Sequence, residues 1–480
     1  MKKFSPIQWV ILVIGFFLLF GNSMIPTFLG FNELAKTILC IFVGTILMLL
    51  TINTIWPTFL CIMAFVFCDV YALDEAVKMF FGSTTFWFVA ICTLMSVPIT
   101  ECGLVKRLAV WFLKRPIARK SPWFFIGTLF VACLLIGSIM NCTVMIVVAI
   151  SLTEEVLAAM NIKKGNRTAE LLMIGVMVMT GVSYGATPIG HPVPVLSMEM
   201  FSDLYSVNFF QYSVQGLIVG VALMLIYILL LKFVFKLDIS EIEGYDPDML
   251  GDLGPMTKEE KVNAGVFAVV IILWLAPSLI SGILPDAAAF LNKFGTLGPA
   301  IVGTVALAII HVNGKPALNV SKALSKTAWS ACIVLAVSLG LSGALNNEEA
   351  GIITHVSDSL GSSLAGMSPI IFLLIVCIFD CVLTNIASDT VACTVSATLA
   401  YTFIASGVVT GVHAGALACA IGVCACTAYA TPPASTYSAV MAGTGWVHAG
   451  RQALIGSLMA FVSVIIAVTL GYGISNLIMV

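Results

Sequence analysis

Apolar stretches long enough to form membrane-spanning helices recur along the chain from Ile7 to Val480, and short polar segments separate them. A helix crosses roughly 30 Å of hydrocarbon with about 20 apolar residues. No polar segment between these stretches is long enough for a soluble catalytic domain. The pattern therefore predicts an all-α polytopic membrane protein with about 11 spans and two additional hairpins.

Lysine and arginine gather in a few polar segments, which the positive-inside rule assigns to the cytoplasm. These segments are Lys106 to Lys120, Lys163 to Arg167, Lys236 to Lys261, Lys315 to Lys326, and the position of Arg451. The assignment predicts a multi-pass protein of the inner (cytoplasmic) membrane, with its N-terminus in the cytoplasm and its C-terminus outside. The apolar stretch after Met1-Lys2-Lys3 is interpreted as a retained first span rather than a cleaved signal.

Two long apolar stretches predict re-entrant hairpins. Basic segments flank both ends of 122–160, so this stretch must enter the membrane from the cytoplasm and return. The polar residues from Gly137 to Thr143 predict a turn at its middle, between two short helices that each cross half of the bilayer. Polar residues also interrupt 369–405, which predicts a second hairpin entering from the opposite face. Irregular backbone at this depth requires burial in protein or a wet cavity.

Short sequence matches recur in the same order in the two halves of the chain. The matched pairs are Glu101 to Leu104 with Glu349 to Ile352, Cys142 to Val144 with Asp389 to Val391, and Gly190 to Pro192 with Ala430 to Pro432. Because the two hairpins open to opposite faces, the halves predict inverted repeats. The third pair places proline inside apolar spans, which predicts an unwound transmembrane helix in each repeat.

Composition excludes several classes of function. Hydrophobic residues make up 60% of the chain and charged residues 10%, which excludes a water-soluble globular protein. The formal net charge of -2 gives no basic surface for nucleic acid. The five histidines are dispersed and the cysteines lie mostly in apolar runs, so no enzyme, metal-cofactor or redox motif is predicted.

Four motifs carry a family resemblance. They are Leu383-Thr384-Asn385-Ile386-Ala387-Ser388-Asp389-Thr390, Ala430-Thr431-Pro432-Pro433 and, more loosely, Asn141-Cys142-Thr143 and Ala186 to Pro192. At these motifs the chain resembles the divalent anion/sodium symporter family, which includes dicarboxylate and citrate transporters. The resemblance covers residues 33 to 480. It implies a homodimer in the lipid bilayer that carries small di- or tricarboxylates, such as succinate, malate or citrate, with sodium by an elevator movement.

The resemblance also implies the binding residues. Those expected to face the substrate are Asn141, Cys142, Thr143, Ser388, Asp389, Thr390 and Pro432. The second sodium site is expected at Thr384, Ala387, Asp389 and Ala430, and the first at Gly137, Asn141, Cys142 and Gly190. Cysteine is a poor sodium ligand, so Cys142 weakens the expectation for the first site. Apart from sodium ions or protons as coupling ions, no cofactor is expected.

The chain departs from the family pattern at Asp389, which replaces asparagine, at His191, which replaces threonine, and at Asn141-Cys142, which stands where Ser-Asn is expected. A carboxylate within the membrane is costly and rarely lacks a partner or a function. Asp389 is therefore interpreted as a sodium ligand, a proton carrier or a structural carboxylate. His191 is a candidate proton site because histidine titrates near neutral pH, with a packing role as the alternative.

Alternatives remain open at the level of function. Proton-coupled symport or anion exchange would use Asp389 and His191 in place of complete sodium sites. A membrane-embedded enzyme is the hypothesis from another class.

The chain is expected to alternate between scaffold spans and transport regions. The scaffold spans are expected at 1–80, at 209–328 with loop 237–261, and at 450–480. The transport regions are expected at 81–208, with hairpin 122–160 and broken helix 168–200, and at 329–449, with hairpin 369–405 and broken helix 411–445.

Overall fold

The structure is a computed structural model of the chain. It describes residues 4–53, 55–140, 142–243, 246, 250–251, 253–364 and 367–479, with side chains undescribed at 142, 360–364 and 433. Asn141, expected in both the substrate site and the first sodium site, lies outside the described residues, as does the side chain of Cys142.

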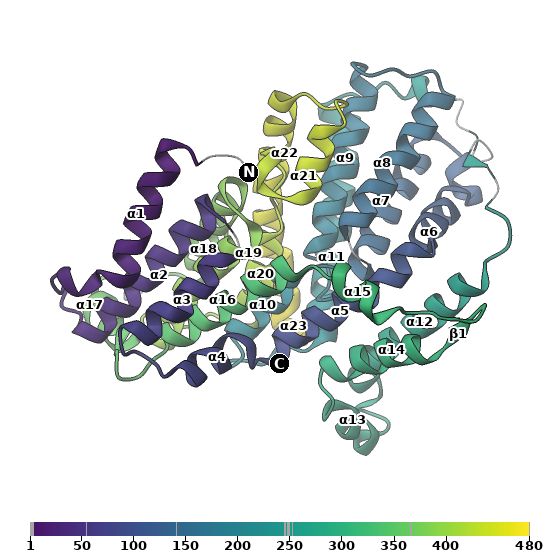
Figure 1. Cartoon of the computed structure of the whole chain (residues 1–480). Coiled ribbons are helices and arrows are strands. Elements are labelled where there is room, and N and C mark those ends of the chain that lie inside the picture. The colour runs from purple at the N-terminus through teal and green to yellow at the C-terminus, as the bar shows by residue number, and fades with distance from the viewer. Residues whose placement is uncertain are drawn as a thin grey trace.

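The fold is almost entirely helical (Figure 1). In the first half the helices are α1 (Pro6–Phe20), α2 (Glu33–Thr51), α3 (Trp56–Phe67), α4 (Leu73–Phe81), α5 (Thr84–Glu101), α6 (Leu104–Leu113), α7 (Pro122–Ile139), α8 (Cys142–Ala159), α9 (Arg167–Tyr184), α10 (Pro192–Met200) and α11 (Phe209–Leu229). A π-helical turn extends α11 to Val234.

The second half begins with α12 (Lys258–Ile280), which follows a polar loop. The other elements are α13 (Pro285–Asn292), α14 (Leu297–Ile309), β1 (His311–Val312), β2 (Lys315–Pro316), α15 (Val320–Lys326), α16 (Trp329–Leu345), α17 (Ile352–Leu364), α18 (Pro369–Ile386), α19 (Asp389–Ala405), α20 (Ala414–Ala425), α21 (Thr436–Gly443), α22 (Ala449–Ile466) and α23 (Tyr472–Ile478). The two short strands pair in antiparallel register.

Two helix pairs occupy the stretches predicted as hairpins. The first pair, α7 and α8, is joined at Met140 and residue 141, and the second, α18 and α19, is joined at Ala387 and Ser388. The turn is therefore shorter than the predicted segment from Gly137 to Thr143, because Gly137 and Ser138 continue the last turn of α7. The predicted half-length arms are also wrong: α7 has 18 residues, which is about 27 Å of helix.

Corresponding residues begin corresponding helices in the two halves. Gly103 and Gly351 both have positive φ, 83° and 61°, directly before α6 and α17. Such a conformation favours glycine because a side chain would be strained there. A serine directly precedes both α7 and α18, and the first residue of each helix is a proline, which fits the first helical turn. These matches support the sequence correspondence between the halves.

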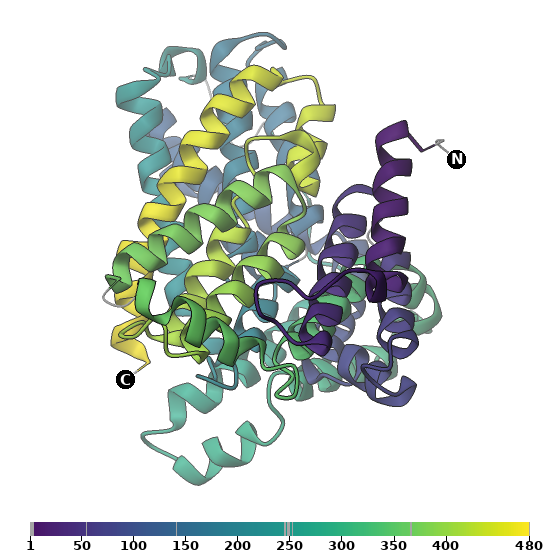
Figure 2. The ribbon, with the colours of Figure 1, turned by 90° about the vertical axis from the view of Figure 1, so that its left-hand side faces the viewer.

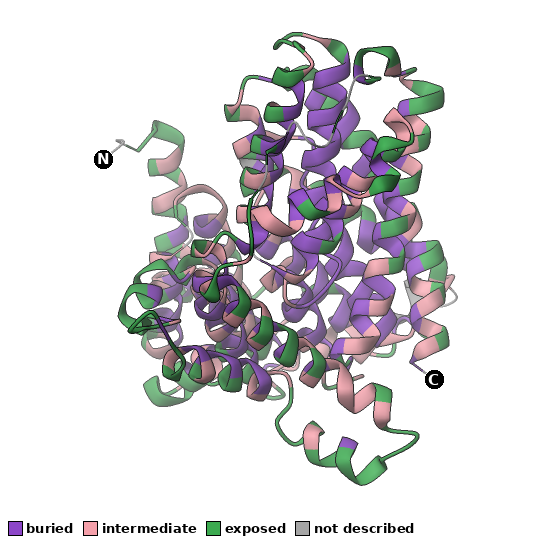
Figure 3. Ribbon diagram, turned by 90° about the vertical axis from the view of Figure 1, so that its right-hand side faces the viewer, coloured by how far each residue is buried: buried purple, intermediate pink, exposed green. Residues whose placement is uncertain are grey.

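The helices around the hairpins form the most buried part of the molecule (Figure 3). Every residue of α9 after Arg167 is buried, and so is every residue of α20 after Ala414. A helix that is buried on all sides lies inside a bundle rather than at its surface. Helix α8 packs on α9 and α21, while α19 packs on α20 and α10, so each hairpin contacts parts of both halves.

Two peripheral groups of helices flank this bundle (Figures 1 and 2). Helices α1 to α4 pack on one another and on α16, and helices α12 to α15 lie on the other side, where α12 and α14 contact α5. Helices α11 and α22 were predicted as scaffold, yet both pack on the hairpin-bearing bundle through α9 and α20.

The described residues contain seven helices long and apolar enough to cross a membrane, or up to nine if two bent pairs each count as one span. This number is below the predicted 11 spans, and it includes α7 and α18. The difference arises because several expected crossings consist of shorter apolar helices, which are Pro6–Phe20, Trp56–Phe67 and Ala414–Ala425.

A buried carboxylate ties the start of α22 to α9. The Glu170 side chain is 1% exposed and accepts hydrogen bonds from the Arg451 guanidinium and, at 2.9 Å, from the backbone N–H of His448. The His448 ring nitrogen Nδ1 lies 3.1 Å from the same carboxylate. A buried charge requires such partners because it has lost its hydration.

Arg451→Ala is expected to lower the free energy of unfolding by roughly 3 kcal/mol, because it leaves the buried Glu170 without its cation. Thermal unfolding of the purified protein in detergent measures this loss. Lys322→Ala is the matched control, since Glu101 is more exposed and keeps a second cation, Lys326, at 2.5 Å. We expect the control to cost less than about 1 kcal/mol. Equal losses in the two variants would contradict the assignment.

Candidate functional site

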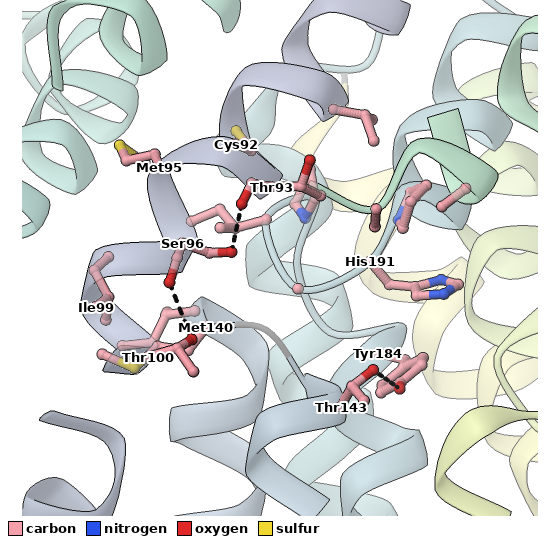
Figure 4. A pocket seen from close by; sticks show the side chains of 18 of the residues that line it. Cys92, Thr93, Met95, Ser96, Ile99, Thr100, Met140, Thr143, Tyr184 and His191 are labelled. Atoms are coloured by element: carbon pink, nitrogen blue, oxygen red, sulfur yellow. Dashed lines mark hydrogen bonds between the residues drawn. The ribbon is translucent and has the colours of Figure 1, made fainter. Parts of the chain in front are cut away.

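A cavity of about 210 Å³ lies where the first hairpin turn meets the break between α9 and α10. One wall is the face of α5 from Phe88 to Thr100, together with Phe267 of α12. The opposite wall contains Thr143 of α8, Tyr184 at the end of α9, and the segment from Pro188 to Pro192. Figure 4 shows the α5 side chains on one side of this cavity and Thr143, Tyr184 and His191 on the other.

Four helices begin at this cavity. The lining includes Thr143 in the first turn of α8, Pro192 at the start of α10, Ser330 in the first turn of α16, and Thr436 at the start of α21. The first N–H groups of a helix lack intrahelical partners, and the helix dipole makes that end partly positive. No lysine, arginine, aspartate or glutamate is among the described lining residues. The start of α10 contributes no such donor, because Pro192 and Pro194 have no N–H and Val193 N–H donates to His191 Nδ1. At the other three helix starts the cavity suits an anion held by backbone N–H groups and hydroxyls.

A chain of contacts connects the two hairpins beside the cavity. Thr143 Oγ1 lies 3.4 Å from the Tyr184 hydroxyl, and the Tyr184 ring stacks on His191 with centroids 4.5 Å apart. His191 Nε2 lies 3.4 Å from Asp389 Oδ2 at the start of α19. The side chains of His191 and Asp389 are 16% and 14% exposed. The two residues predicted as a proton site are thus in contact.

The hydrogen bonds of His191 indicate which ring nitrogen carries the proton. Its Nδ1 accepts a hydrogen bond from the backbone N–H of Val193 at 3.5 Å, as the cap of α10. An accepting nitrogen bears no hydrogen, so we assign the proton to Nε2, which faces Asp389. In this arrangement Nε2 is the ring nitrogen that can donate to Asp389 Oδ2.

The second hairpin is fastened to the break between α20 and α21 by Asn385. Its amide nitrogen donates to the carbonyls of Cys381 and Thr427 at 2.8 and 2.9 Å, and its Oδ1 accepts from Ala430 N–H at 2.8 Å. Thr431 Oγ1 donates to the Asn385 carbonyl at 2.6 Å. Thr384 Oγ1 donates to another carbonyl of this region, that of Ala425, at 2.6 Å.

The first hairpin is fastened in a corresponding way. Thr187 donates from its hydroxyl to the carbonyl of Ser138, the penultimate residue of α7, just as Thr431 does to Asn385 of α18. The sequence match aligned His191 with Thr431, whereas this hydrogen bond aligns Thr187 with it. The two alignments differ by four residues, because the breaks in the two halves have different internal structures.

Backbone carbonyls converge on Gly190. A Cβ at this position would lie 2.9 Å from the carbonyl oxygen of Gly137, 3.3 Å from that of Ser183 and 3.4 Å from that of Ser138. Gly137 and Ser138 belong to the last turn of α7, where carbonyls have no intrahelical donors. Gly137 and Gly190, both predicted for the first sodium site, are therefore adjacent.

Only some of the predicted site residues reach the cavity. Thr143, Gly190 and His191 line it, whereas Ser388, Asp389, Thr390 and Pro432 are not among its described lining residues. Asp389 instead lies behind His191, and its Oδ1 accepts the N–H of Thr390 at 2.7 Å. Ala387 and Asp389 flank the turn of the second hairpin, and Ala430 is linked to it through Asn385.

Sequence reasoning missed the α5 wall. Thr93, Ser96 and Thr100 line the cavity and each hydroxyl donates to a carbonyl of its own helix, at 3.0, 2.8 and 3.0 Å. Their spacing of three and four residues places them on one helix face. A polar stripe with helical spacing in an apolar span was the signal that could have identified this wall.

A second cavity, of about 290 Å³, adjoins the first. Phe88 and Pro188 line both. Phe88 packs edge-to-face on Trp274, whose indole N–H donates to the Thr296 carbonyl at 2.7 Å. The second cavity lies near the starts of α5 and α11. The two cavities therefore lie one after the other along α5, from Thr84 to Thr100, and Phe88 stands between them.

Comparison with known proteins assigns the family. The family described as "Sodium:sulfate symporter transmembrane region" matches residues 7–480, which is nearly the whole chain. The chain belongs to this sodium:sulfate symporter family. The predicted relationship to divalent anion/sodium symporters is thereby confirmed, and a multi-pass membrane protein of an anion transporter family is established.

Two relatives with curated descriptions are more distant. A "Membrane protein" of Cupriavidus necator is 22% identical over 286 residues, covering 57% of this chain and 53% of that protein. "Dicarboxylate transporter 2.1, chloroplastic" of Arabidopsis thaliana is 28% identical over 132 residues, covering 27% of this chain and 20% of that protein. The matches thus span about half of the first relative and a fifth of the second.

A solved structure shares the fold of the symporter homologue described here. The YdaH transporter of Alcanivorax borkumensis aligns with a TM-score of 0.54 at 14% identity, over 83% of this chain and 88% of that one. At this identity the likeness concerns the arrangement of helices alone. It agrees with the helical bundle described above.

Proposed function

We propose that the protein is a secondary active transporter that carries small organic anions together with sodium ions. The observation that carries this proposal is the convergence of the N-termini of α8, α16 and α21 on one cavity that no charged described residue lines. Such a site attracts a carboxylate without a fixed cation that would hinder its release. Di- and tricarboxylates such as succinate, malate and citrate are the first substrates to test, since one relative bears the name dicarboxylate transporter.

The proposed mechanism is an elevator movement of two inverted repeats. The moving body comprises the hairpins α7–α8 and α18–α19, the broken helices, and the helices α11 and α22 that pack on them. The fixed body comprises α1 to α4, α12 to α15, and α5, whose hydroxyl-bearing face contacts the cavity. The matching helix starts and threonine hydrogen bonds in the two halves support the repeats. The homodimer, the inner-membrane location and the orientation of the termini belong to the same proposal.

The proposed sodium sites use backbone oxygens and few side chains. Near the first hairpin, the carbonyls of Gly137, Ser138 and Ser183 surround Gly190 and provide several hard oxygen ligands. Near the second, the expected ligands Thr384, Ala387, Asp389 and Ala430 lie around the hairpin turn. Asn141 and Cys142 remain part of the proposal for the first site.

A proton-coupled symporter or an exchanger is the second candidate. The contact between His191 Nε2 and Asp389 Oδ2 favours it, because a histidine beside a carboxylate forms a site that can accept a proton. In that case Asp389 and His191 replace the second sodium ion as the coupling site. Substitution of either residue would then alter the ion dependence of uptake rather than the affinity for the substrate alone.

Uptake into proteoliposomes tests the proposal. We expect an inward sodium gradient to drive accumulation of at least one labelled acid among succinate, malate and citrate, and no accumulation in protein-free vesicles. Accumulation driven only by a pH gradient would support proton coupling. Uptake that requires an internal anion and neither gradient would indicate exchange. Absence of uptake of every acid in all three regimes would contradict the transporter assignment of this site.

A further inference from the structure

A cavity of about 440 Å³ lies between α6 and the segment that precedes α12. No described residue lines both this cavity and the one beside the first hairpin. No aspartate or glutamate is among its described lining residues. The lining combines three cations with apolar side chains, which are Arg107, Lys114 and Arg115 with Val110, Trp111 and Met256. The cavity therefore offers positive charge to an anion and apolar surface to hydrocarbon beside it.

Arg107 builds a wall of this cavity and is fully used by the protein itself. Its Nε donates to the buried carboxylate of Glu260 in α12 at 2.7 Å. Its terminal nitrogens donate to the carbonyls of Leu253 and Gly254 at 3.2 and 2.7 Å. These bonds hold the segment before α12 against α6, so the shape of the cavity does not depend on a ligand.

Arg115 and Lys114 keep donors that the chain does not use. The Arg115 guanidinium carbon lies 3.3 Å from the centroid of the Trp111 ring, and its Nε is shielded from water without a hydrogen-bond partner among the described residues. A charged group that has lost hydration without gaining a hydrogen bond is costly, and an anion in the adjoining cavity offsets this cost. Lys114 donates one of its three ammonium hydrogens to the Gly251 carbonyl, at 2.5 Å.

The surroundings of the cavity suit the boundary between lipid headgroups and hydrocarbon. Trp111, Ile117 and Phe124 are all exposed apolar side chains. Tryptophan and basic residues gather at this depth of a membrane, and the positive-inside rule predicts that this segment faces the cytoplasm. Basic pockets on that side of a membrane bind anionic lipid headgroups.

We propose that this cavity binds the phosphate group of an anionic phospholipid, with Arg115 and Lys114 donating to its oxygens and Trp111 and Met256 against its glycerol and first acyl carbons. Arginine suits a phosphate because its planar fork forms two parallel hydrogen bonds, and lysine adds a point charge. A free phosphate ion offers the same oxygens but leaves the apolar part of the cavity without contacts. The bound lipid joins α6, which leads into the first hairpin, to the segment before α12. This site does not depend on the proposed function.

Thermal unfolding of the purified protein in detergent tests the site with three probes: phosphatidylglycerol, phosphatidylcholine and inorganic phosphate. We expect phosphatidylglycerol to raise the unfolding temperature in a saturable way. At the same concentrations, phosphatidylcholine and inorganic phosphate should change it by less than a quarter as much. Inorganic phosphate acting as strongly as phosphatidylglycerol would overturn the assignment to a lipid. Equal effects of the two lipids would overturn the role of the charge.

Arg115→Gln is expected to raise the phosphatidylglycerol concentration for half-maximal stabilisation by at least about fivefold, because the paired donors and one positive charge are lost. Arg115→Lys should give a smaller increase, since it keeps the charge without the planar fork. Lys120→Gln is the matched control: it removes one charge from the same basic segment at an exposed residue that is not among the described lining residues. We expect the control to change this concentration by less than about twofold.

Equal changes in Arg115→Gln and Lys120→Gln would mean that lipid responds to the overall charge of the segment, and would overturn the site. Native mass spectrometry provides a second measurement if Arg115→Gln does not fold. The unmodified protein should retain phosphatidylglycerol in preference to phosphatidylcholine, and Lys114→Gln should retain less of it than Lys120→Gln. Retention of both lipids alike, or equal retention by these two variants, would also overturn the inference.

Discussion

Replacing Gly190 with alanine is expected to reduce sodium-driven uptake by at least about tenfold, because a new methyl group meets three backbone carbonyls. The Cβ would lie 2.9 Å from the Gly137 oxygen and 3.3 and 3.4 Å from those of Ser183 and Ser138. Backbone groups at a helix end move less readily than side-chain tips, so the carbonyls must separate or turn. Either change alters the oxygen cluster proposed as the first sodium site.

The measurement is the sodium dependence of uptake, together with thermal stabilisation of the purified variant by sodium alone. We expect both to be lost or shifted to higher sodium concentration, while the protein remains folded in detergent. Gly443→Ala is the control, since a Cβ at this exposed position of α21 meets nothing within 4 Å. A Gly190→Ala variant with unchanged uptake and unchanged sodium dependence would remove the argument for this oxygen cluster.

The length of the apolar stretches predicted where the helices of the second hairpin lie. The expected stretch 369–405 agrees with the bounds of the pair α18 and α19. A proline begins both α7 and α18, where it fits the first helical turn, and Ser121 caps α7 by accepting the N–H of Phe124. The turn of the first hairpin was predicted too long, since Gly137 and Ser138 are compatible with a helix when neighbouring helices bury them.

Only the part of the candidate site that lies within a sequence motif could be predicted from the sequence. The motif around Asp389 gave the second hairpin turn, but the contact between Asp389 and His191 depends on how two distant segments pack, which no local pattern encodes. Tyr184 and the α5 hydroxyls were missed for a related reason. Within an apolar span, a hydroxyl that bonds to its own helix looks the same whether it faces lipid, protein or a cavity.

The packing partners of the predicted scaffold spans were not predictable from the sequence either. Residues 209–328 and 450–480 were grouped as scaffold from their order along the chain, yet α11 and α22 pack on the hairpin-bearing bundle. Apolar composition specifies that a helix lies in the membrane, but lipid and protein are equally apolar surroundings. The choice of partner depends instead on small residues and polar contacts, as Gly456 against the Tyr429 carbonyl illustrates.

Asn385→Ala is expected to have the second large effect, because it removes the side chain that joins the second hairpin to the break of α20 and α21. Three hydrogen bonds are lost, and the N–H of Ala430, which is 7% exposed, is left without its acceptor. A buried donor without a partner costs more than a hydrogen bond contributes on average, so we expect a loss of about 3 kcal/mol of unfolding free energy.

Transport should fall by more than stability alone explains, since the same bonds position the turn that carries Asp389. We expect the maximal uptake rate of Asn385→Ala to fall at least about tenfold at temperatures where the variant is still folded, with a raised sodium requirement. Asn319→Ala is the matched control: it removes the cap of α15, where Asn319 Oδ1 accepts Lys322 N–H at 3.0 Å, and costs about 1 kcal/mol without touching the site. If both variants lose stability but transport equally well, Asn385 is a structural residue only, and the hairpin turn does not depend on it for its working geometry.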